Sequence, residues 1–177
     1  MKLPFITISL IAILLSSCSA IKVRGQKSAS NLFESFSAGD EGTQYFIKPF
    51  ELEQTEEKGN VILDVLFRHK LHIKDSAIIN FTIQDLNIIK SVDEIKFVNA
   101  YETIQSNAIK FMFNEKPKKG FISRFTTKIS LAELSELFKN NDWKVTIHFN
   151  KRERIYTPSR KSKKKIETLN NNLFILF

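Results

Sequence analysis

A strict alternation of apolar and polar residues is the feature of this sequence that most limits its possible folds. From Val61 to Phe67 every odd-numbered residue is apolar, and the charged residues Asp64 and Arg68 occupy even positions. The same period of two recurs at 79–83, 121–129 and 143–149. Because successive side chains of a strand point to opposite faces, this pattern predicts β-strands that bury one face and expose the other.

One segment breaks the period of two and predicts a helix. Ser130 and Glu133 have the spacing of a capping box. An apolar stripe at helical spacing accompanies them: Leu131, Leu134, Leu137 and Phe138. Weaker strands are expected at 45–52, 94–98, 108–113 and 163–169, and a final buried strand is expected at Leu173–Phe177. We therefore predict a mainly β fold, an immunoglobulin-like antiparallel β-sandwich with one short helix at about 131–140.

The composition is that of a globular domain. Of the 177 residues, 42% are hydrophobic and 26% are charged, which argues against a disordered chain. A single Cys excludes an intramolecular disulfide framework and a zinc site with four Cys ligands. Walker, dinucleotide-binding and nucleophile-elbow motifs are all absent from the sequence, so we expect no cofactor.

The N-terminus has the layout of an export signal. Met1-Lys2 provides a basic start, and the apolar stretch Leu3–Leu15 is shorter than the roughly 20 residues that a transmembrane helix needs. The segment that follows, Leu15-Ser16-Ser17-Cys18, resembles the lipobox of bacterial lipoproteins. The resemblance covers residues 1–18 only. It implies that a signal peptide, 1–17, is removed and that Cys18 is acylated and anchors the protein in a membrane.

The rest of the chain is expected to form a Ser/Ala/Gly-rich tether, 18–44, and a single domain, 45–177. By the sorting habit of bacterial lipoproteins, Ser19 favours the outer membrane. The lack of an acidic cluster after Cys18 favours the periplasmic side of that membrane. The alternative is a secretory signal that is cleaved near Ala20, which would leave Cys18 in the discarded peptide.

Positive charge is concentrated in one segment, residues 151–167, which holds eight basic and two acidic side chains. We expect a turn at 157–159 and therefore a basic hairpin, whose candidate contact residues for an anionic surface are Lys151, Arg152, Arg154, Arg160, Lys161, Lys163, Lys164 and Lys165. Anionic lipid, glycan or an acidic protein would fit this segment, and nucleic acid is the weakest of the possible partners. The alternative is a solvated hairpin whose lysines only discourage strand pairing between molecules.

The sequence holds no clear catalytic or metal-binding constellation. His69 and His72 are three residues apart in a predicted strand and so point to opposite faces, and His148 is on the outward face of another strand. We therefore expect no metal and no enzyme, but a lipid-anchored envelope protein that acts by binding, as an accessory subunit of an outer-membrane or periplasmic assembly. An inhibitor or immunity-type lipoprotein and a small hydrolase are the alternatives.

Overall fold

The computed structural model describes residues 31–56, 59–71 and 76–176. Within these ranges the strands are β1 (Phe33–Ser37), β2 (Thr43–Gln54), β3 (Asn60–His69), β4 (Ser76–Asp85), β5 (Glu94–Val98), β6 (Thr103–Ser106), β7 (Lys110–Glu115), β8 (Phe121–Ser130), β9 (Lys144–Phe149) and β10 (Arg152–Pro158). The helices are α2 (Leu131–Phe138) and α3 (Arg160–Asn172), with short 3₁₀ turns η1 (Gly39–Glu41) and η2 (Phe174–Leu176).

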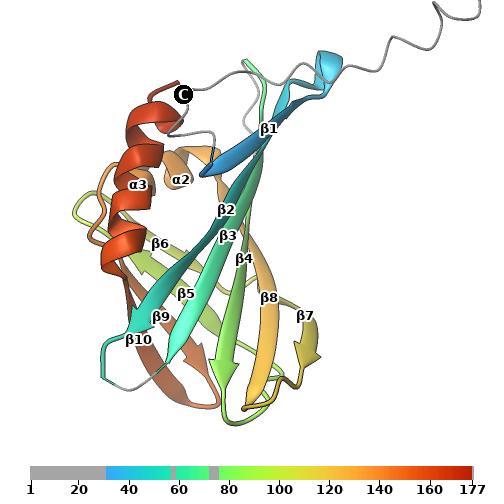
Figure 1. The fold of residues 1–177 in the computed structure, drawn as a ribbon, viewed down its shortest axis with the longest axis vertical. Helices are drawn as coiled ribbons and strands as arrows, with labels where there is room; N and C mark the ends of the chain where they lie inside the picture. Colours follow the sequence, from blue (N-terminus) through green and yellow to red (C-terminus); the bar gives the residue numbers. More distant parts are fainter. Residues whose placement is uncertain (1–30, 57–58, 72–75, 177) are drawn as a thin grey trace, which may run out of the picture.

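All of these strands belong to one antiparallel sheet, in the order β6-β5-β9-β10-β2-β3-β4-β8-β7, with β1 paired to β2. The sheet curls into a half-barrel (Figure 1), and the Ser106 hydroxyl of β6 lies 2.6 Å from the Thr127 hydroxyl of β8. The predicted mainly β fold is confirmed. The immunoglobulin-like sandwich is not confirmed, because the long strand β2 pairs with both β3 and β10 and so joins all strands into a single sheet.

The alternating residues found in the sequence form the dry inner face of this sheet. Phe81 on β4 and Phe125 on β8 are fully buried, and their rings stack with centroids 5.4 Å apart. Phe67 on β3 and Trp143, just before β9, lie on the predicted inward faces and are 1% and 2% exposed. Their burial confirms the strand faces that the period of two predicts.

The helix predicted at about 131–140 is confirmed as α2. The Glu133 N–H donates to the Ser130 hydroxyl at 3.1 Å and the Ser130 N–H donates to the Glu133 carboxylate at 2.7 Å, which completes the capping box. The indole N–H of buried Trp143 donates to the carbonyl oxygens of Leu137 and Asn140. These bonds satisfy the polar groups that the end of the helix would otherwise leave buried and unpaired.

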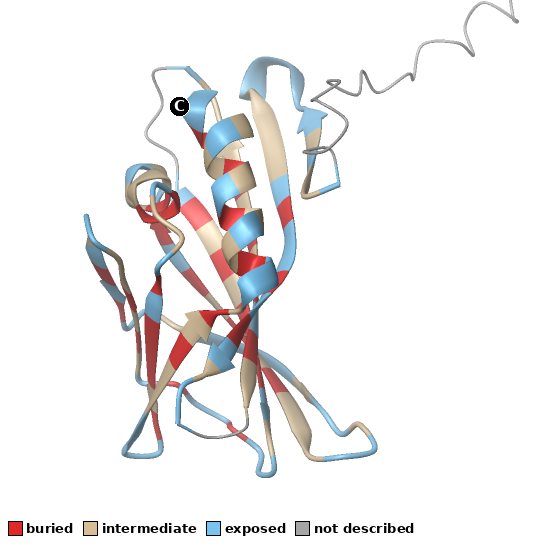
Figure 2. Ribbon diagram, turned by 60° about the vertical axis from the view of Figure 1, so that its left-hand side comes forward, coloured by how far each residue is buried: buried red, intermediate tan, exposed pale blue. Residues whose placement is uncertain are grey.

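The strands predicted at 163–169 and 173–177 are wrong, because these residues lie in or next to α3 and η2. Ile166, Leu169 and Leu173 are buried at helical spacing, and Phe174 stacks on Phe138 and Phe67 at centroid distances of 4.3 and 5.8 Å. In Figure 2 the buried residues of α3 face the sheet and exposed residues cover its outer side. The two helices and η2 therefore close one end of the half-barrel.

The folded domain begins earlier than the predicted boundary at residue 45. β1 lies inside the segment that was expected to be a tether, and it pairs with β2 from Phe33↔Ile47 to Ser37↔Thr43. Leu32 and Phe33 pack against the core, which gives this strand its apolar face. Residues 1–30, which include the predicted signal peptide and Cys18, lie outside the described residues. Of the helices in the described ranges, none has the length and apolar character needed to cross a membrane.

Candidate functional site

The structure divides the predicted basic segment into two groups at different ends of β10. Lys151 and Arg152 lie at the turn between β9 and β10, where Asn150 and Lys151 have positive φ angles of 51° and 59°. The second group lies on α3 and consists of Arg160, Lys161, Lys163, Lys164 and Lys165. The seven residues of β10 separate the groups by roughly 20 Å. The single basic hairpin is therefore wrong, because β10 continues through Pro158 and Ser159 caps α3 where a turn was expected.

Arg154 lies between these groups and has a structural role. It shares a face of β10 with buried Tyr156, points into the half-barrel and forms an ion pair with Asp85 at the end of β4. The two side chains are only 16% and 10% exposed, and the guanidinium lies 4.9 Å from the centroid of the Phe149 ring. Burial lowers the pKa of Arg154, but the hydrogen bonds and charges of Asp85 and, to a lesser degree, Tyr156 together outweigh burial and raise this pKa above its usual value. The pair bridges β10 and β4 at the end of the half-barrel that lies away from the helices.

The first turns of α3 attach the helix to an edge of β2 that has no strand beside it. β10 pairs with β2 at residues 52–54 and β1 pairs with it at 43–47, which leaves the bulged stretch 48–51 between them. The Ser159 N–H donates to the Glu51 carbonyl oxygen at 3.3 Å, and the Glu51 N–H donates to the Ser162 hydroxyl at 3.0 Å. The α3 backbone and hydroxyl groups thus replace a missing strand, and this fixes where the lysines of α3 lie.

Three lysines gather where α3 meets this bulge, and we call Lys48, Lys161 and Lys165 the lysine cluster. The Lys165 ammonium donates to the Pro49 carbonyl oxygen at 3.0 Å. Burial lowers the pKa of Lys165, and the charges of Lys161 and Lys48 lower it further. A groove of about 240 Å³ lies between Lys161 and Lys165, with the hydroxyls of Ser159 and Ser162 in its wall. Lys48 also forms an ion pair with Glu34 at 3.4 Å, and Glu51 lines the groove, so Lys161 and Lys165 are the positions of the cluster where a further anionic group would bind.

Lys163 does not contribute to this cluster. It forms an ion pair with Asp142, which lies two residues before β9 begins. Arg160 and Lys164 are exposed on the same helix. The basic surface of α3 therefore consists of the lysine cluster together with Arg160 and Lys164.

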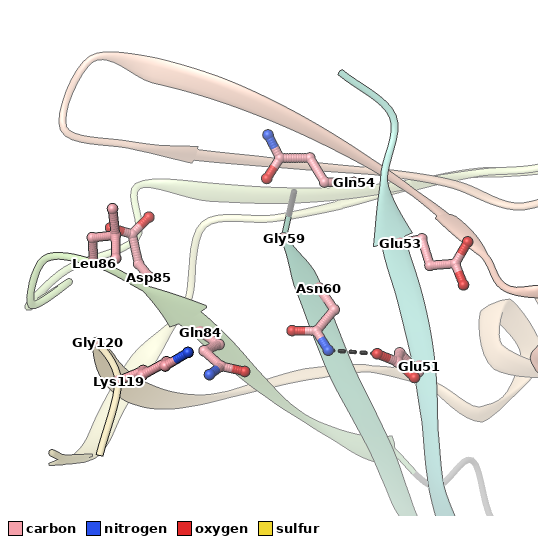
Figure 3. Close-up of a pocket in the computed structure, with 10 residues that line it drawn as sticks. All are labelled: Glu51, Glu53, Gln54, Gly59, Asn60, Gln84, Asp85, Leu86, Lys119 and Gly120. Carbon is pink, nitrogen blue, oxygen red and sulfur yellow. Dashed lines mark hydrogen bonds between the residues drawn. The ribbon is translucent and has the colours of Figure 1, made fainter. Parts of the chain in front are cut away.

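A second cleft, of about 530 Å³, lies near the opposite end of the sheet (Figure 3). It is lined by Glu51, Glu53, Gln54, Gly59, Asn60, Gln84, Asp85, Leu86, Lys119 and Gly120. Glu51 accepts a hydrogen bond from the Asn60 amide, and Asp85 is held by Arg154 and by the Asn87 N–H. In Figure 3 Glu53 points away from Lys119. Glu51 and Asp85 already have hydrogen-bond partners, and Glu53 points away. These carboxylates therefore do not form a general acid and base pair.

The fold and these surfaces were compared with models of protein families, with curated proteins and with solved structures. None of the three comparisons found a match.

The two histidines in the described part of the chain, His69 and His148, do not converge on a metal site. His148 lies 3.4 Å from the Glu153 carboxylate and 3.8 Å from that of Glu94, and it pairs across strands with both residues. His69 ends β3, and His72 lies outside the described residues. In the described parts of the chain, no group of three or more His, Cys, Asp or Glu side chains could hold a metal ion.

A polar network on the outer face of the sheet escaped the sequence analysis. The Arg124 guanidinium of β8 donates to Asp64 of β3 at 2.6 Å and to the Thr82 hydroxyl of β4 at 2.8 Å. Beside it, a groove of about 570 Å³ includes the half-exposed rings of Phe36 and Phe46, which meet edge to face at 5.6 Å. Only the pairing of three strands brings these residues together, so their spacing in the sequence carries no signal of the network.

Proposed function

We propose that this chain is a lipid-anchored protein of the bacterial cell envelope that acts by binding, with the basic surface of α3 held against an anionic surface. The proposed anchor is Cys18, on the strength of the lipobox-like Leu15-Ser16-Ser17-Cys18. The proposed location is the periplasmic side of the outer membrane. The proposed role is that of an accessory subunit in an envelope assembly.

The observation that carries this proposal is the place where the chain enters the folded domain. The Lys48 N–H donates to the Leu32 carbonyl oxygen at 2.9 Å, so the first described residues lie directly beside the lysine cluster. Asn31 follows Cys18 by thirteen positions. Even fully extended, this length of chain reaches at most about 45 Å. An anchor at Cys18 would therefore keep the entry point within about 45 Å of the membrane, so the lysines beside it can reach the surface.

Charge then favours one orientation of the tethered domain. Each basic residue close to an anionic membrane contributes about 1 kcal/mol. Lys161 and Lys165 of the cluster, with Arg160 and Lys164, provide four such residues on the side where the chain enters, while Lys48 beside them is paired with Glu34. The hairpin group, Lys151 and Arg152, lies at the far end of β10 and would point away from the same surface.

Binding to anionic vesicles tests this orientation. Residues 18–177 with Cys18→Ala lack a lipid, and all the core side chains lie within this range. Replacing Lys161, Lys164 and Lys165 by Gln should weaken binding on the order of 100-fold at low salt, at about 1 kcal/mol for each charge. The matched control replaces Lys118, Lys151 and Arg152 by Gln, three exposed charges in the β7–β8 and β9–β10 turns at the end of the half-barrel away from α3.

The control should bind within about threefold of the parent chain, because its charges lie away from the proposed contact surface. Threefold is well below the tenfold change that 1.4 kcal/mol would produce. Equal losses in both triple variants would contradict the proposed orientation and show that only net charge matters. Unchanged binding in the α3 variant would remove the anionic surface as a partner of α3.

A further inference from the structure

β7 is an edge strand with an apolar centre that faces solvent. Within the described residues it pairs only with β8, so its other edge is open. Phe111, Met112 and Phe113 are 46%, 47% and 41% exposed. An exposed apolar edge of this kind is a template for pairing with another strand.

The charges of β7 are arranged symmetrically about this centre. Lys110 begins the strand and Glu115 ends it, with no other charged residue between them. Two copies of the strand that run antiparallel can place Lys110 of each opposite Glu115 of the other. Opposite charges directly across a strand pair are favourable, and like charges are unfavourable.

A β-bulge in β7 allows the same antiparallel pairing to match the faces of the side chains as well as the charges. Directly paired residues share a face, so Lys110, Phe113 and Glu115 face outward with their partners on β8, while Phe111 and Asn114 face inward with Phe125 and Ser123. The register slips by one between Phe111 and Phe113, which makes Met112 the extra residue. Placing Met112 with Phe113 opposite Arg124, on the outward side, makes the order of faces the same when β7 is read from either end. A regular six-residue strand would put its two ends on opposite faces.

We propose that two copies of this chain associate through their β7 strands, paired antiparallel about a two-fold axis that passes between Met112 and Phe113. Lys110 then lies opposite Glu115 twice, Phe111 lies opposite Asn114, and Met112 lies opposite Phe113. At every pair both residues face the same side. The curled sheets of the two copies become one continuous sheet across the interface.

Each neighbouring register is unfavourable, one because of its side-chain faces and the other because of its charges. A shift of one residue in one direction sets Lys110 opposite Asn114, an outward residue against an inward one. A shift in the other direction sets Lys110 opposite Lys116, a like-charge pair. The proposed register is thus favoured over both of its neighbours.

The pairing leaves the proposed membrane contact free. β7 extends the sheet beyond β8, whereas α3 packs on β2 and β10 (Figure 1). A single pair of six-residue strands forms a small interface, of the size class found in weak and transient complexes. Association should therefore be measured where the protein is concentrated, on the membrane that carries it.

Charge reversal in the full chain tests the register directly. Two differently tagged copies are co-expressed, and the copy retained by one tag is quantified after mild solubilisation. Two unaltered copies should co-purify. Two Lys110→Glu copies, or two Glu115→Lys copies, should lose at least about tenfold, because each interface then contains two like-charge pairs.

The decisive arm mixes the two variants. A Lys110→Glu copy and a Glu115→Lys copy together restore both opposite-charge pairs, so their co-purification should return to the unaltered level. A reversal of Lys144 on β9, Lys144→Glu, serves as the control and should change nothing. Failure of unaltered copies to co-purify, or failure of the mixed pair to recover, would overturn the proposal.

A disulfide across the axis adds a geometric readout. A copy with Met112→Cys and a differently tagged copy with Phe113→Cys should crosslink under mild oxidation, because these positions lie opposite each other. Met112→Cys with Asn114→Cys is the out-of-register control, since these residues do not face each other. Equal crosslinking in both combinations would show that the strands do not adopt this register and would overturn the proposal.

Discussion

Replacement of Arg154 by Met tests how the half-barrel is closed at the end away from the helices. The substitution removes the guanidinium and keeps a long apolar side chain near the Phe149 ring. Asp85 then keeps the Asn87 N–H as a hydrogen-bond donor but loses its ion-pair partner. A carboxylate that is only 10% exposed would have to remain charged in the interior or take up a proton.

The structure sets the size of the expected effect. Removing one partner of a buried ion pair costs about 3–5 kcal/mol. Because the Arg154 side chain retains 16% exposure, we expect the lower end of this range, about 3 kcal/mol. For a domain of this size such a loss lowers the melting temperature by about 6–12 °C.

Urea unfolding of residues 18–177 with Cys18→Ala measures this loss. Arg152→Met is the matched control, because Arg152 lies two residues earlier on the same strand and is exposed. It should change the free energy of unfolding by less than about 0.5 kcal/mol. The double variant Arg154→Met/Asp85→Asn should cost clearly less than the two single changes added together, because it leaves no buried charge behind. Equal free energies of unfolding for Arg154→Met and Arg152→Met would show that Arg154 does not hold the half-barrel closed and contributes no more to stability than an exposed residue.

Three further predictions concern folding, each measured by urea unfolding. Phe81→Ala should cost about 3–5 kcal/mol because its ring is fully buried, whereas the outward change Lys144→Ala should stay within about 0.5 kcal/mol, and the reverse order would invert the strand faces. Ser130→Ala removes the cap of α2 and should cost about 1 kcal/mol, so an unchanged midpoint would mean the capping box contributes nothing. Gly42→Ala should cost more than 1 kcal/mol, because φ is +91° and the new Cβ would lie 2.3 Å from the His69 carbonyl oxygen; a neutral result would contradict this backbone geometry.

The strands at 61–67 and 79–83 could be predicted because one face of each is completely buried. In 61–67 and 79–83 every inward residue is apolar, so the period of two is unbroken and the faces follow from it. β1 was missed because it is short and largely exposed, and only Leu32 and Phe33 pack against the core. A segment with so little apolar surface has the composition of a tether.

α3 was missed for a different reason. Five of the six residues from Arg160 to Lys165 are basic, and this run hides the helical spacing of the apolar residues Ile166, Leu169 and Leu173. The usable signal was Ser159 as a helix cap before them. An apolar stripe along one face is enough to pack a helix against a sheet. The opposite face of the helix is exposed and can be entirely charged.

The candidate site depends on contacts that sequence spacing does not reveal. Lys48 reaches the lysines of α3 only because a bulge in β2 leaves an edge for the helix to cover. Arg154 was grouped with surface lysines, yet curling of the sheet brings it to Asp85, 69 residues earlier in the chain. Charge composition identified the right segment, and the topology determined which of its charges face solvent.

The state of Cys18 in the mature protein tests the central claim most directly. The full chain is expressed in a bacterium that processes lipoproteins, the membrane fraction is isolated, and the N-terminal peptide is analysed by mass spectrometry. We predict that the protein begins at Cys18 and that this residue carries acyl chains, and that Cys18→Ala abolishes both the modification and the membrane retention. A mature protein that begins after Ala20, or one that retains an unmodified Cys18, would contradict the account.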